Sequence, residues 1–222
     1  MNKNQYNEYT EIFSKHQCTD INYRNDMHNL FPNLKNKKVL DLGCGDGEDL
    51  KFFIKSEASM VCGIDASEKF LKIAKTKASD AKLICGDFCT KLAFQDDFFD
   101  IVYSQFAINH EKNIEFIFEE VYRVLKPNGI FLLLVTHHIR QFLVSNTKDY
   151  SANIPFKEIF FDGEVCVQSY THRIEEYLSV PILSKFNLLK LKEGFFNDEE
   201  KYNDKWIYPS YLILKYKKKE IL

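Results

Sequence analysis

Hydrophobic and polar residues follow each other along this chain in blocks, and the blocks change period in a regular order. From position 37, short continuous apolar runs are separated by segments in which apolar residues recur every three or four positions. A continuous apolar run of this length is typical of a strand buried on both faces, and the longer spacing is typical of an amphipathic helix. The pattern predicts five buried strands, at 37–43, 60–65, 81–87, 98–105 and 129–138.

Helices are predicted between these strands. Ser67 is a suitable N-cap for a helix after the second strand. The helix before the fifth strand is expected to end at Leu125, because Pro127 cannot continue it. Strands that alternate with helices and are apolar throughout indicate a parallel sheet covered on both faces. With right-handed crossovers, the fold class is α/β and doubly wound.

The segments that flank this pattern are different in character. Residues 1–36 are polar with scattered aromatics and favour helices near 9–13 and 26–30. After His138, two β-rich runs surround Asp162-Gly163, a strong hairpin signal. A helix interrupted near Pro181 precedes two strands, at 187–194 and 208–219, close enough to form an antiparallel pair at a sheet edge. We expect a single domain, with a helical cap, a ligand-binding core, an insertion with a hairpin, and a C-terminal helix with two strands, at 1–36, 37–138, 139–171 and 172–222.

Composition and charge exclude several classes of function. The 222 residues carry a net charge of -2, which argues against a broad basic face for nucleic acid. The six cysteines form no CxxC pair and none has a histidine beside it, so we expect no zinc site and no other metal. Reduced cysteines and the lack of any long apolar segment lead us to expect a cytoplasmic protein that neither enters nor crosses a membrane.

The glycine-rich turn after the first strand, "GCGDGE", holds the candidate chemistry. In a doubly wound sheet, ligands bind beyond the carboxyl ends of the strands, and glycines let ligand atoms approach the backbone. A dinucleotide-binding turn reads G-x-G-x-x-G, whereas here the third glycine comes one place early. The acidic residues Asp46, Glu48 and Asp49 would repel a pyrophosphate, so the turn is predicted to suit a ligand with positive charge.

Two further acids support this reading. Asp65 ends the second strand, where an acid accepts hydrogen bonds from ribose hydroxyls. Asp87 ends the third strand and is placed to meet an adenine amino group. An acid at three neighbouring strand ends describes an adenosine with a cationic tail, as in S-adenosylmethionine, which carries a sulfonium and an ammonium group.

At this point the chain resembles the class I S-adenosylmethionine-dependent methyltransferases, of the small-molecule type. "VLDLGCGDG", "GIDAS", "CGDF", "FDIVYSQFAINH" and "YRVLKPNGIFLL" are similar to five motifs of that family, in order, across residues 37–135. The resemblance implies a Rossmann-like sheet of seven mostly parallel strands with an antiparallel last strand. It also implies an enzyme of class EC 2.1.1.-, with S-adenosylhomocysteine as product. The cofactor contacts that it implies are Asp41, Gly43, Cys44, Gly45, Gly47, Asp65, Ala66, Asp87, Phe88, Ser104 and Gln105.

The substrate side offers histidines and aromatics. Small-molecule methyltransferases of this class have a similar layout, with His-Pro after the fifth strand and a later Tyr-His-Arg. Here His138 replaces that proline. An acceptor that keeps its proton at neutral pH needs a general base, and the candidates are His110, His137 and His172. We expect the acceptor to be lined by Tyr9, Phe13, Tyr170 and Arg173, with the N-terminal helix and the insertion as a lid.

Three functions remain open on the sequence. The first is a methyltransferase that moves a methyl group to an oxygen or nitrogen of a small molecule by in-line displacement, as a monomer or homodimer. The second is a protein or RNA methyltransferase. Base and glutamine methyltransferases carry a Pro-Pro dipeptide after the fourth strand, which this chain lacks. The third is a non-catalytic domain that binds S-adenosylmethionine or S-adenosylhomocysteine.

Overall fold

The computed structural model describes residues 3–16, 22–196 and 208–220, and its centre is a seven-stranded sheet with the order β3-β2-β1-β4-β5-β9-β8. The strands are β1 (Lys38–Leu42), β2 (Met60–Asp65), β3 (Lys82–Cys85), β4 (Phe99–Gln105), β5 (Leu125–Thr136), β8 (Phe186–Gly194) and β9 (Tyr211–Lys218). β1 to β5 pair in parallel, and β9 runs antiparallel to both β5 and β8. The predicted fold is therefore confirmed. The strand order reverses between β1 and β4, which is where doubly wound sheets bind ligands.

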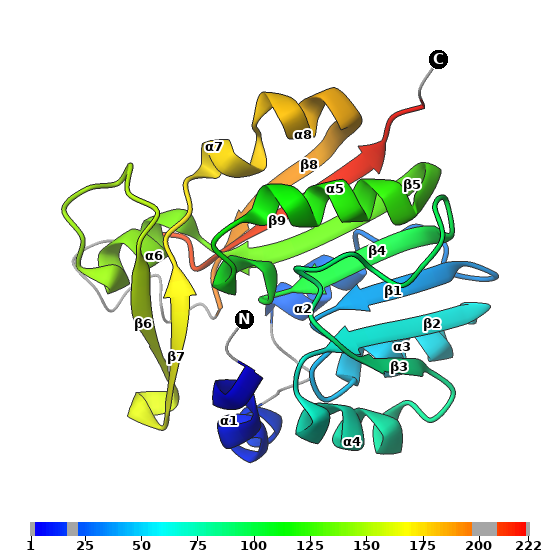
Figure 1. Ribbon diagram of the computed structural model, residues 1–222, viewed down its shortest axis with the longest axis horizontal. Helices are drawn as coiled ribbons and strands as arrows, with labels where there is room; N and C mark the ends of the chain where they lie inside the picture. The colour runs from blue at the N-terminus through cyan, green and yellow to red at the C-terminus, as the bar shows by residue number, and fades with distance from the viewer. Residues whose placement is uncertain (1–2, 17–21, 197–207, 221–222) are drawn as a thin grey trace.

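Helices cover both faces of this sheet (Figure 1). They are α1 (Lys3–His16), α2 (Asn22–His28), α3 (Glu48–Lys55), α4 (Glu68–Lys77), α5 (Ile114–Val124), α6 (His138–Ser145), α7 (Ile174–Tyr177) and α8 (Val180–Lys185), with 3-10 turns η1 (Ile108–His110) and η2 (Phe161–Gly163). On one face Phe118 of α5 contacts Phe131 of β5, with ring centroids 5.3 Å apart. On the other face Phe53 of α3 contacts Tyr103 of β4 at 5.4 Å. Two separate aromatic-rich cores thus hold the layers together.

The local predictions for the core are confirmed with small shifts. The Ser67 hydroxyl caps α4 by accepting a hydrogen bond from the Phe70 amide. α5 ends at Val124, one residue earlier than expected, and β5 pairing already starts at Leu125. Helix α6 was not predicted, because its apolar residues do not form a buried stripe: Ile139 and Leu143 are 39% and 45% exposed.

The predicted hairpin is present as β6 (Pro155–Phe160) and β7 (Val165–Tyr170), a two-stranded sheet apart from the main one. Helix α1 lies between this hairpin and α4 (Figure 1). Phe13 of α1 contacts Phe70 of α4 and Phe160 of β6, each with ring centroids 6.1 Å apart. The N-terminal helix therefore bridges the cofactor half of the sheet to the hairpin. Cys18 and most of the charged loop predicted between the last two strands lie outside the described residues.

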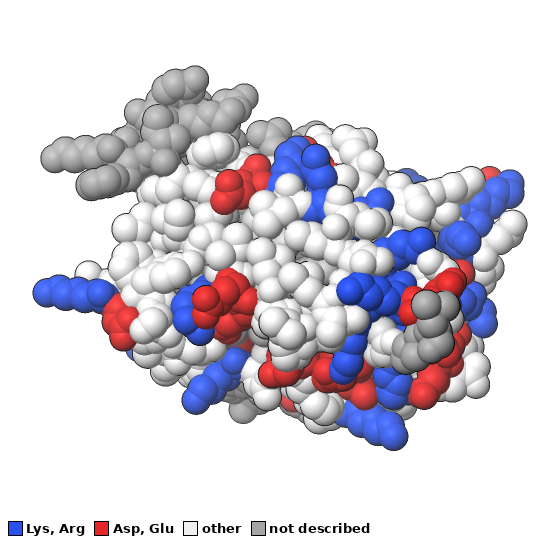
Figure 2. Space-filling model, turned by 90° about the horizontal axis from the view of Figure 1, so that it is seen from above, with Lys and Arg blue, Asp and Glu red and all other residues white. Residues whose placement is uncertain are grey.

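The surface and the helix lengths bear on possible partners. No helix in the described ranges combines the length and apolar character that a bilayer span needs. On the face shown in Figure 2, lysine and arginine side chains are mixed with aspartate and glutamate around an uncharged centre. That face therefore presents no single basic stripe of the kind that follows a nucleic-acid backbone.

Candidate functional site

The glycine turn at the carboxyl end of β1 adopts a conformation that only glycine holds easily. Gly43, Gly45 and Gly47 have φ angles of +80°, +50° and +83°. A Cβ added at Gly43 would lie 2.3 Å from the Cβ of Ala107, in the loop after β4. The Gly43 amide donates to the Ile64 carbonyl of β2 at 2.8 Å. The turn is thus held tightly between the ends of β2 and β4, with its backbone facing the switch point of the sheet.

Asp41 is the buried acid of this turn. Its side chain is 2% exposed, and no hydrogen bond to its carboxylate occurs among the described residues. Burial raises the pKa of Asp41 well above its usual value, and the negative charges of Asp49 and Asp65 raise it further. A buried carboxylate without donors is costly, so this position favours a ligand that brings a positive charge.

Asp65 links the glycine turn to the next helix. Its Oδ2 accepts a hydrogen bond from the Gly45 amide at 2.9 Å, and its Oδ1 accepts one from the Ser67 amide at 2.8 Å. Burial raises the pKa of Asp65, although these amides act in the opposite direction. Each carboxylate oxygen has a second lone pair, so the side chain can hold the backbone and still accept hydrogen bonds from a ligand.

The other acids of the turn are ion-paired within the protein, which the sequence interpretation did not foresee. Lys77 of α4 pairs with Asp46 at 2.6 Å and with Glu48 at 3.2 Å. Arg24 of α2 pairs with Asp49 at 2.5 Å. Burial alone would raise the pKa of Asp49, but the hydrogen bond from His28 and the charge of Arg24 lower it. Among the acids near the turn, Asp41 and Asp65 are therefore the ones whose negative charge is not paired with a lysine or arginine of the described residues.

The residues expected around the adenine lie beside the turn. Phe88 is 1% exposed, and its ring would be 3.6 Å from a Cβ at Gly43. Asp87 is half-buried, and its Oδ1 accepts from the Cys89 amide at 2.9 Å. Ala66 and Cys44 are buried, at 5% and 7% exposed. Phe88 forms part of the core as well as one wall of the turn.

The two β4 residues expected near the sulfonium differ in role. The Ser104 hydroxyl, fully buried, donates to the Leu42 carbonyl at 2.9 Å and so ties β4 to the end of β1. The Gln105 carbonyl oxygen accepts from the Tyr103 hydroxyl at 2.7 Å. Gln105 is half-buried, and its amide nitrogen stays available as a donor.

Two of the three candidate histidines have both ring nitrogens engaged. His137 caps α6: its Nδ1 accepts from the Ile139 amide at 3.2 Å, and its Nε2 lies 2.8 Å from Glu193 Oε1. His172 Nδ1 lies 2.8 Å from Glu176, and its Nε2 lies 2.8 Å from the Glu111 carbonyl. These contacts hold α6 and α7 in place, and a role of His137 or His172 as a base would require one of them to break.

His110 is arranged differently. Its Nδ1 lies 2.5 Å from the Ser169 hydroxyl oxygen of β7. Burial lowers the pKa of His110 to about 4, although the carbonyls of Phe106 and Gln168 favour the charged ring. His110 is thus a neutral imidazole whose Nδ1 contacts the hairpin, three residues beyond the Ala107 that touches the glycine turn.

The expected acceptor-lining residues come from α1, β7 and the start of α7. Tyr9 and Phe13 of α1 pack into the aromatic cluster beneath the hairpin. The Tyr170 hydroxyl accepts from the Gln168 amide at 3.1 Å. Arg173 caps α7 and pairs with Glu175 at 2.5 Å. Arg173 is therefore committed to its own helix end, while α1 is the segment that closes over the site.

Polar residues that sequence reasoning missed are buried here. Asn109 is fully buried, and both polar atoms of its side chain have no partner among the described residues. Glu158 and Ser169 are buried on the inner face of the hairpin, 5% and 0% exposed. The alternation of Val165, Val167 and Ser169 marked an inward face, but only the hairpin register shows which residues of β6 share it.

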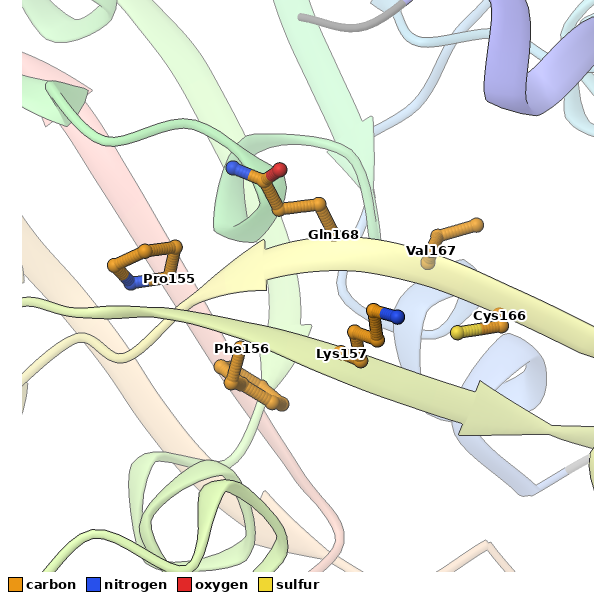
Figure 3. A pocket seen from close by; sticks show the side chains of 6 residues that line it. All are labelled: Pro155, Phe156, Lys157, Cys166, Val167 and Gln168. Carbon is orange, nitrogen blue, oxygen red and sulfur yellow. The ribbon is translucent and has the colours of Figure 1, made fainter.

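A hollow of about 370 Å³ also lies on the hairpin (Figure 3). Its lining is Pro155, Phe156, Lys157, Cys166, Val167 and Gln168. Lys157 is the one charged residue among these, so the hollow offers no acid to a cationic ligand. The glycine turn with Asp41 and Asp65 is the better candidate site on chemical grounds.

Comparisons with known proteins agree with this geometry. A family model described as "Methyltransferase domain" matches residues 40–133. A sterol 24-C-methyltransferase of Gibberella zeae is 39% identical over 100 residues, which are 42% of this chain and 26% of that protein. The chain spans less than half the length of the curated relatives that it matches.

Solved structures extend the likeness over nearly the whole chain. A Listeria monocytogenes protein assigned to the S-adenosylmethionine-dependent methyltransferases aligns with a TM-score of 0.76 at 25% identity, covering 88% of this chain and 96% of that one. The 1,6-didemethyltoxoflavin-N1-methyltransferase of Burkholderia thailandensis aligns with a TM-score of 0.64 at 14% identity, covering 98% and 87%. At 14% identity, the alignment with the Burkholderia protein shows similarity of fold alone.

Proposed function

The chain belongs to the class I S-adenosylmethionine-dependent methyltransferases, and from that premise we propose that it methylates an oxygen or nitrogen atom of a small-molecule acceptor. The Gibberella relative is named as a methyltransferase of a sterol, which favours a small molecule. The lack of a Pro-Pro dipeptide after β4 makes base or glutamine methylation a weaker alternative.

The observation that carries the proposal is the carboxylate of Asp41, which accepts no hydrogen bond from the residues that the structure describes. It is buried at the end of β1, beneath a turn that Ala107 leaves too tight for any residue but glycine. S-adenosylmethionine fits this donor set, because its ammonium would satisfy Asp41 and its ribose hydroxyls would meet Asp65. We expect Gly43 to Gly47 to border the methionine part, and Asp87 with Phe88 to flank the adenine.

When bound, S-adenosylmethionine supplies a methyl group on a positively charged sulfur. The chain's own task is then to align the acceptor with that methyl group and to exclude water, a contribution of about 7–11 kcal/mol. We expect helix α1 to cover the site. The ring centroids of Tyr6 on α1 and His110 are 5.8 Å apart. We expect His110, whose neutral ring lies beside Tyr6 and Ser169, to take a proton from the acceptor.

We further propose a cytoplasmic protein, as a monomer or homodimer. The five cysteines that the structure describes are all free thiols. The described residues contain no group of side chains suited to a metal ion, and in-line methyl transfer from S-adenosylmethionine needs none.

Isothermal titration with S-adenosylmethionine, S-adenosylhomocysteine and NAD tests the cofactor. Incubation with S-adenosylmethionine and a metabolite extract, followed by detection of S-adenosylhomocysteine, tests turnover. Binding with turnover supports the proposal, while binding without turnover on any extract supports the sensor alternative. Turnover on protein or RNA fractions only would support the macromolecular alternative.

A further inference from the structure

We propose that Glu158, Ser169 and His110 form a proton relay that carries the acceptor's proton away from the reacting atom to Glu158. This inference rests on the proposed methyl transfer. It assigns a role to two hairpin residues, Glu158 and Ser169, that lie far from the cofactor motifs in the sequence.

The relay is a continuous chain of short contacts. His110 Nδ1 lies 2.5 Å from Ser169 Oγ, and Ser169 Oγ lies 2.6 Å from Glu158 Oε2. The three residues come from three elements, η1, β7 and β6. Ser169 is 0% and Glu158 is 5% exposed, so the contacts are shielded from water.

Packing alone does not account for Glu158. Apart from Ser169, the other buried residues on this inner face of the hairpin are apolar: Phe156, Val165 and Val167. A carboxyl group at such a position costs free energy that a hydrophobic residue of similar volume would avoid. The single hydrogen bond from Ser169 compensates this cost only in part, which points to a chemical role.

The hydrogen-bond directions fix the state of the histidine. When Glu158 is ionised, the Ser169 hydroxyl donates to it, and Ser169 Oγ accepts from the Nδ1–H of His110. The lone pair of the imidazole is then on Nε2, the nitrogen that does not contact Ser169. When Glu158 is protonated, both hydrogen bonds reverse and Nε2 carries the hydrogen.

Protons and charge are conserved in the proposed step. The acceptor's proton moves to His110 Nε2, the Nδ1 proton moves to Ser169 Oγ, and the hydroxyl proton moves to Glu158 Oε2. The bond from the methyl carbon to the acceptor forms while the bond to sulfur breaks, with its electron pair staying on sulfur. The positive charge lost at sulfur is matched by the neutralised Glu158 carboxylate, and His110 stays neutral throughout.

The electrostatic surroundings suit these roles. Burial, together with the nearby His172, lowers the pKa of His110 to about 4 against the opposing effect of the Phe106 and Gln168 carbonyls, so the ring resists becoming a cation. Burial raises the pKa of Glu158, although the Ser169 hydrogen bond and the charge of Arg140 on α6 oppose this. A carboxylate with a raised pKa accepts a proton more readily than one on the surface.

The test is ¹⁵N NMR of the histidine side chains in the full chain saturated with S-adenosylhomocysteine. The imidazole nitrogen with the lone pair resonates far downfield of the one bearing hydrogen, so the tautomer of His110 is read directly. In alkaline buffer we expect the lone pair on Nε2. On acidification the hydrogen should shift to Nε2 before the ring becomes charged. Ser169→Ala and Glu158→Gln should abolish this step, while Lys157→Gln and Gln168→Ala, on the outer hairpin face, should retain it.

A His110 that keeps hydrogen on Nε2 in alkaline buffer, or one tautomer at every pH in the unaltered protein, overturns the relay even if a variant fails to fold. Retention of the step in Ser169→Ala overturns it as well. Saturation by S-adenosylhomocysteine, measured by calorimetry, reports the folding of each variant. If the protein binds no S-adenosylhomocysteine, the proposed function fails, and the same spectra of the free protein still decide the relay.

Discussion

Asp65 Oδ2 accepts a hydrogen bond from the backbone amide of Gly45 at 2.9 Å, across 20 positions of sequence. This contact joins the end of β2 to the glycine turn, so one carboxylate sets the shape of the turn and also lies where ribose hydroxyls would bind. The two strands meet here because β1 and β2 are parallel neighbours, with Leu42 opposite Ile64. The glycine turn, Asp41 and Asp65 together form an acidic cradle. Its shape and its affinity for a nucleoside are therefore coupled.

Asp65→Ala should weaken binding of S-adenosylmethionine by about tenfold or more. The loss corresponds to ~1.5–3 kcal/mol, the range for hydrogen bonds to a charged group. Calorimetric titration measures the change, and Asp80→Ala, at an exposed acid after α4, is the matched control. Equal affinity in Asp65→Ala and the unaltered protein would remove Asp65 from the site.

Gly43→Ala should destabilise the fold and abolish cofactor binding. The substitution meets two penalties: a left-handed φ, at about 1–2 kcal/mol, and a clash with Ala107, at about 1–3 kcal/mol. Gly163→Ala in the hairpin is the control, because Gly163 has a φ of +97° and no atom within 4 Å of an added Cβ. Chemical denaturation should show the larger loss at Gly43, and equal losses at both positions would contradict the close packing against Ala107.

The fold could be predicted because its signals are local. The apolar runs, the spacing of the helices and the turn glycines each depend on neighbours within a few positions. The cradle acids at the ends of β1 and β2 followed from the same pattern. The ion pairs of Asp46, Glu48 and Asp49 could not be predicted, because their partners Lys77 and Arg24 come from segments 25 to 31 positions away.

The substrate side could be predicted only in part. His110 was identified as a candidate, but its contact with Ser169 spans 59 positions and depends on how α5, β5 and the hairpin are arranged. The hairpin register, with Phe156 opposite Ser169, decides that Glu158 shares the inner face. A one-residue slip would have turned Glu158 to solvent, so no pattern in the sequence alone could assign it.

Asp41→Asn should raise the stability of the free protein and weaken the binding of S-adenosylmethionine. Burial and the charges of Asp49 and Asp65 raise the folded-state pKa of Asp41 above the unfolded value of ~3.9, with Arg24 opposing them. Between the unfolded and the folded-state pKa of Asp41, the folded chain binds more protons than the unfolded one, so the free energy of unfolding falls as pH rises. Asparagine does not ionise, so the variant does not lose stability in this way as pH rises.

Melting temperatures measured across pH, with and without S-adenosylmethionine, check the Asp41 prediction. Asp41→Asn should exceed the unaltered protein near neutrality, and the gap should close on acidification toward the unfolded pKa. Added S-adenosylmethionine should stabilise the unaltered protein more than the variant. A variant that melts lower at neutral pH and binds the cofactor as tightly would show that Asp41 has a structural partner instead.

Asn109→Leu should raise the free energy of unfolding by about 1 kcal/mol and weaken acceptor binding. Both polar atoms of Asn109 are buried without partners among the described residues, and each unmet hydrogen bond costs about 1–3 kcal/mol. Denaturation and the KM for the acceptor are the measurements, with Asn187→Leu on β8, an exposed site, as control. Lower stability together with an unchanged KM would argue that Asn109 serves packing alone.

Calorimetric titration of the unaltered protein and of Asp41→Asn with S-adenosylmethionine and with NAD tests the central claim most directly. The account predicts that the unaltered chain binds S-adenosylmethionine, binds NAD weakly or not at all, and loses affinity for S-adenosylmethionine when Asp41 is neutral. Tighter binding of NAD, or unaltered affinity for S-adenosylmethionine in the variant, would contradict an acidic cradle built for a cationic nucleoside.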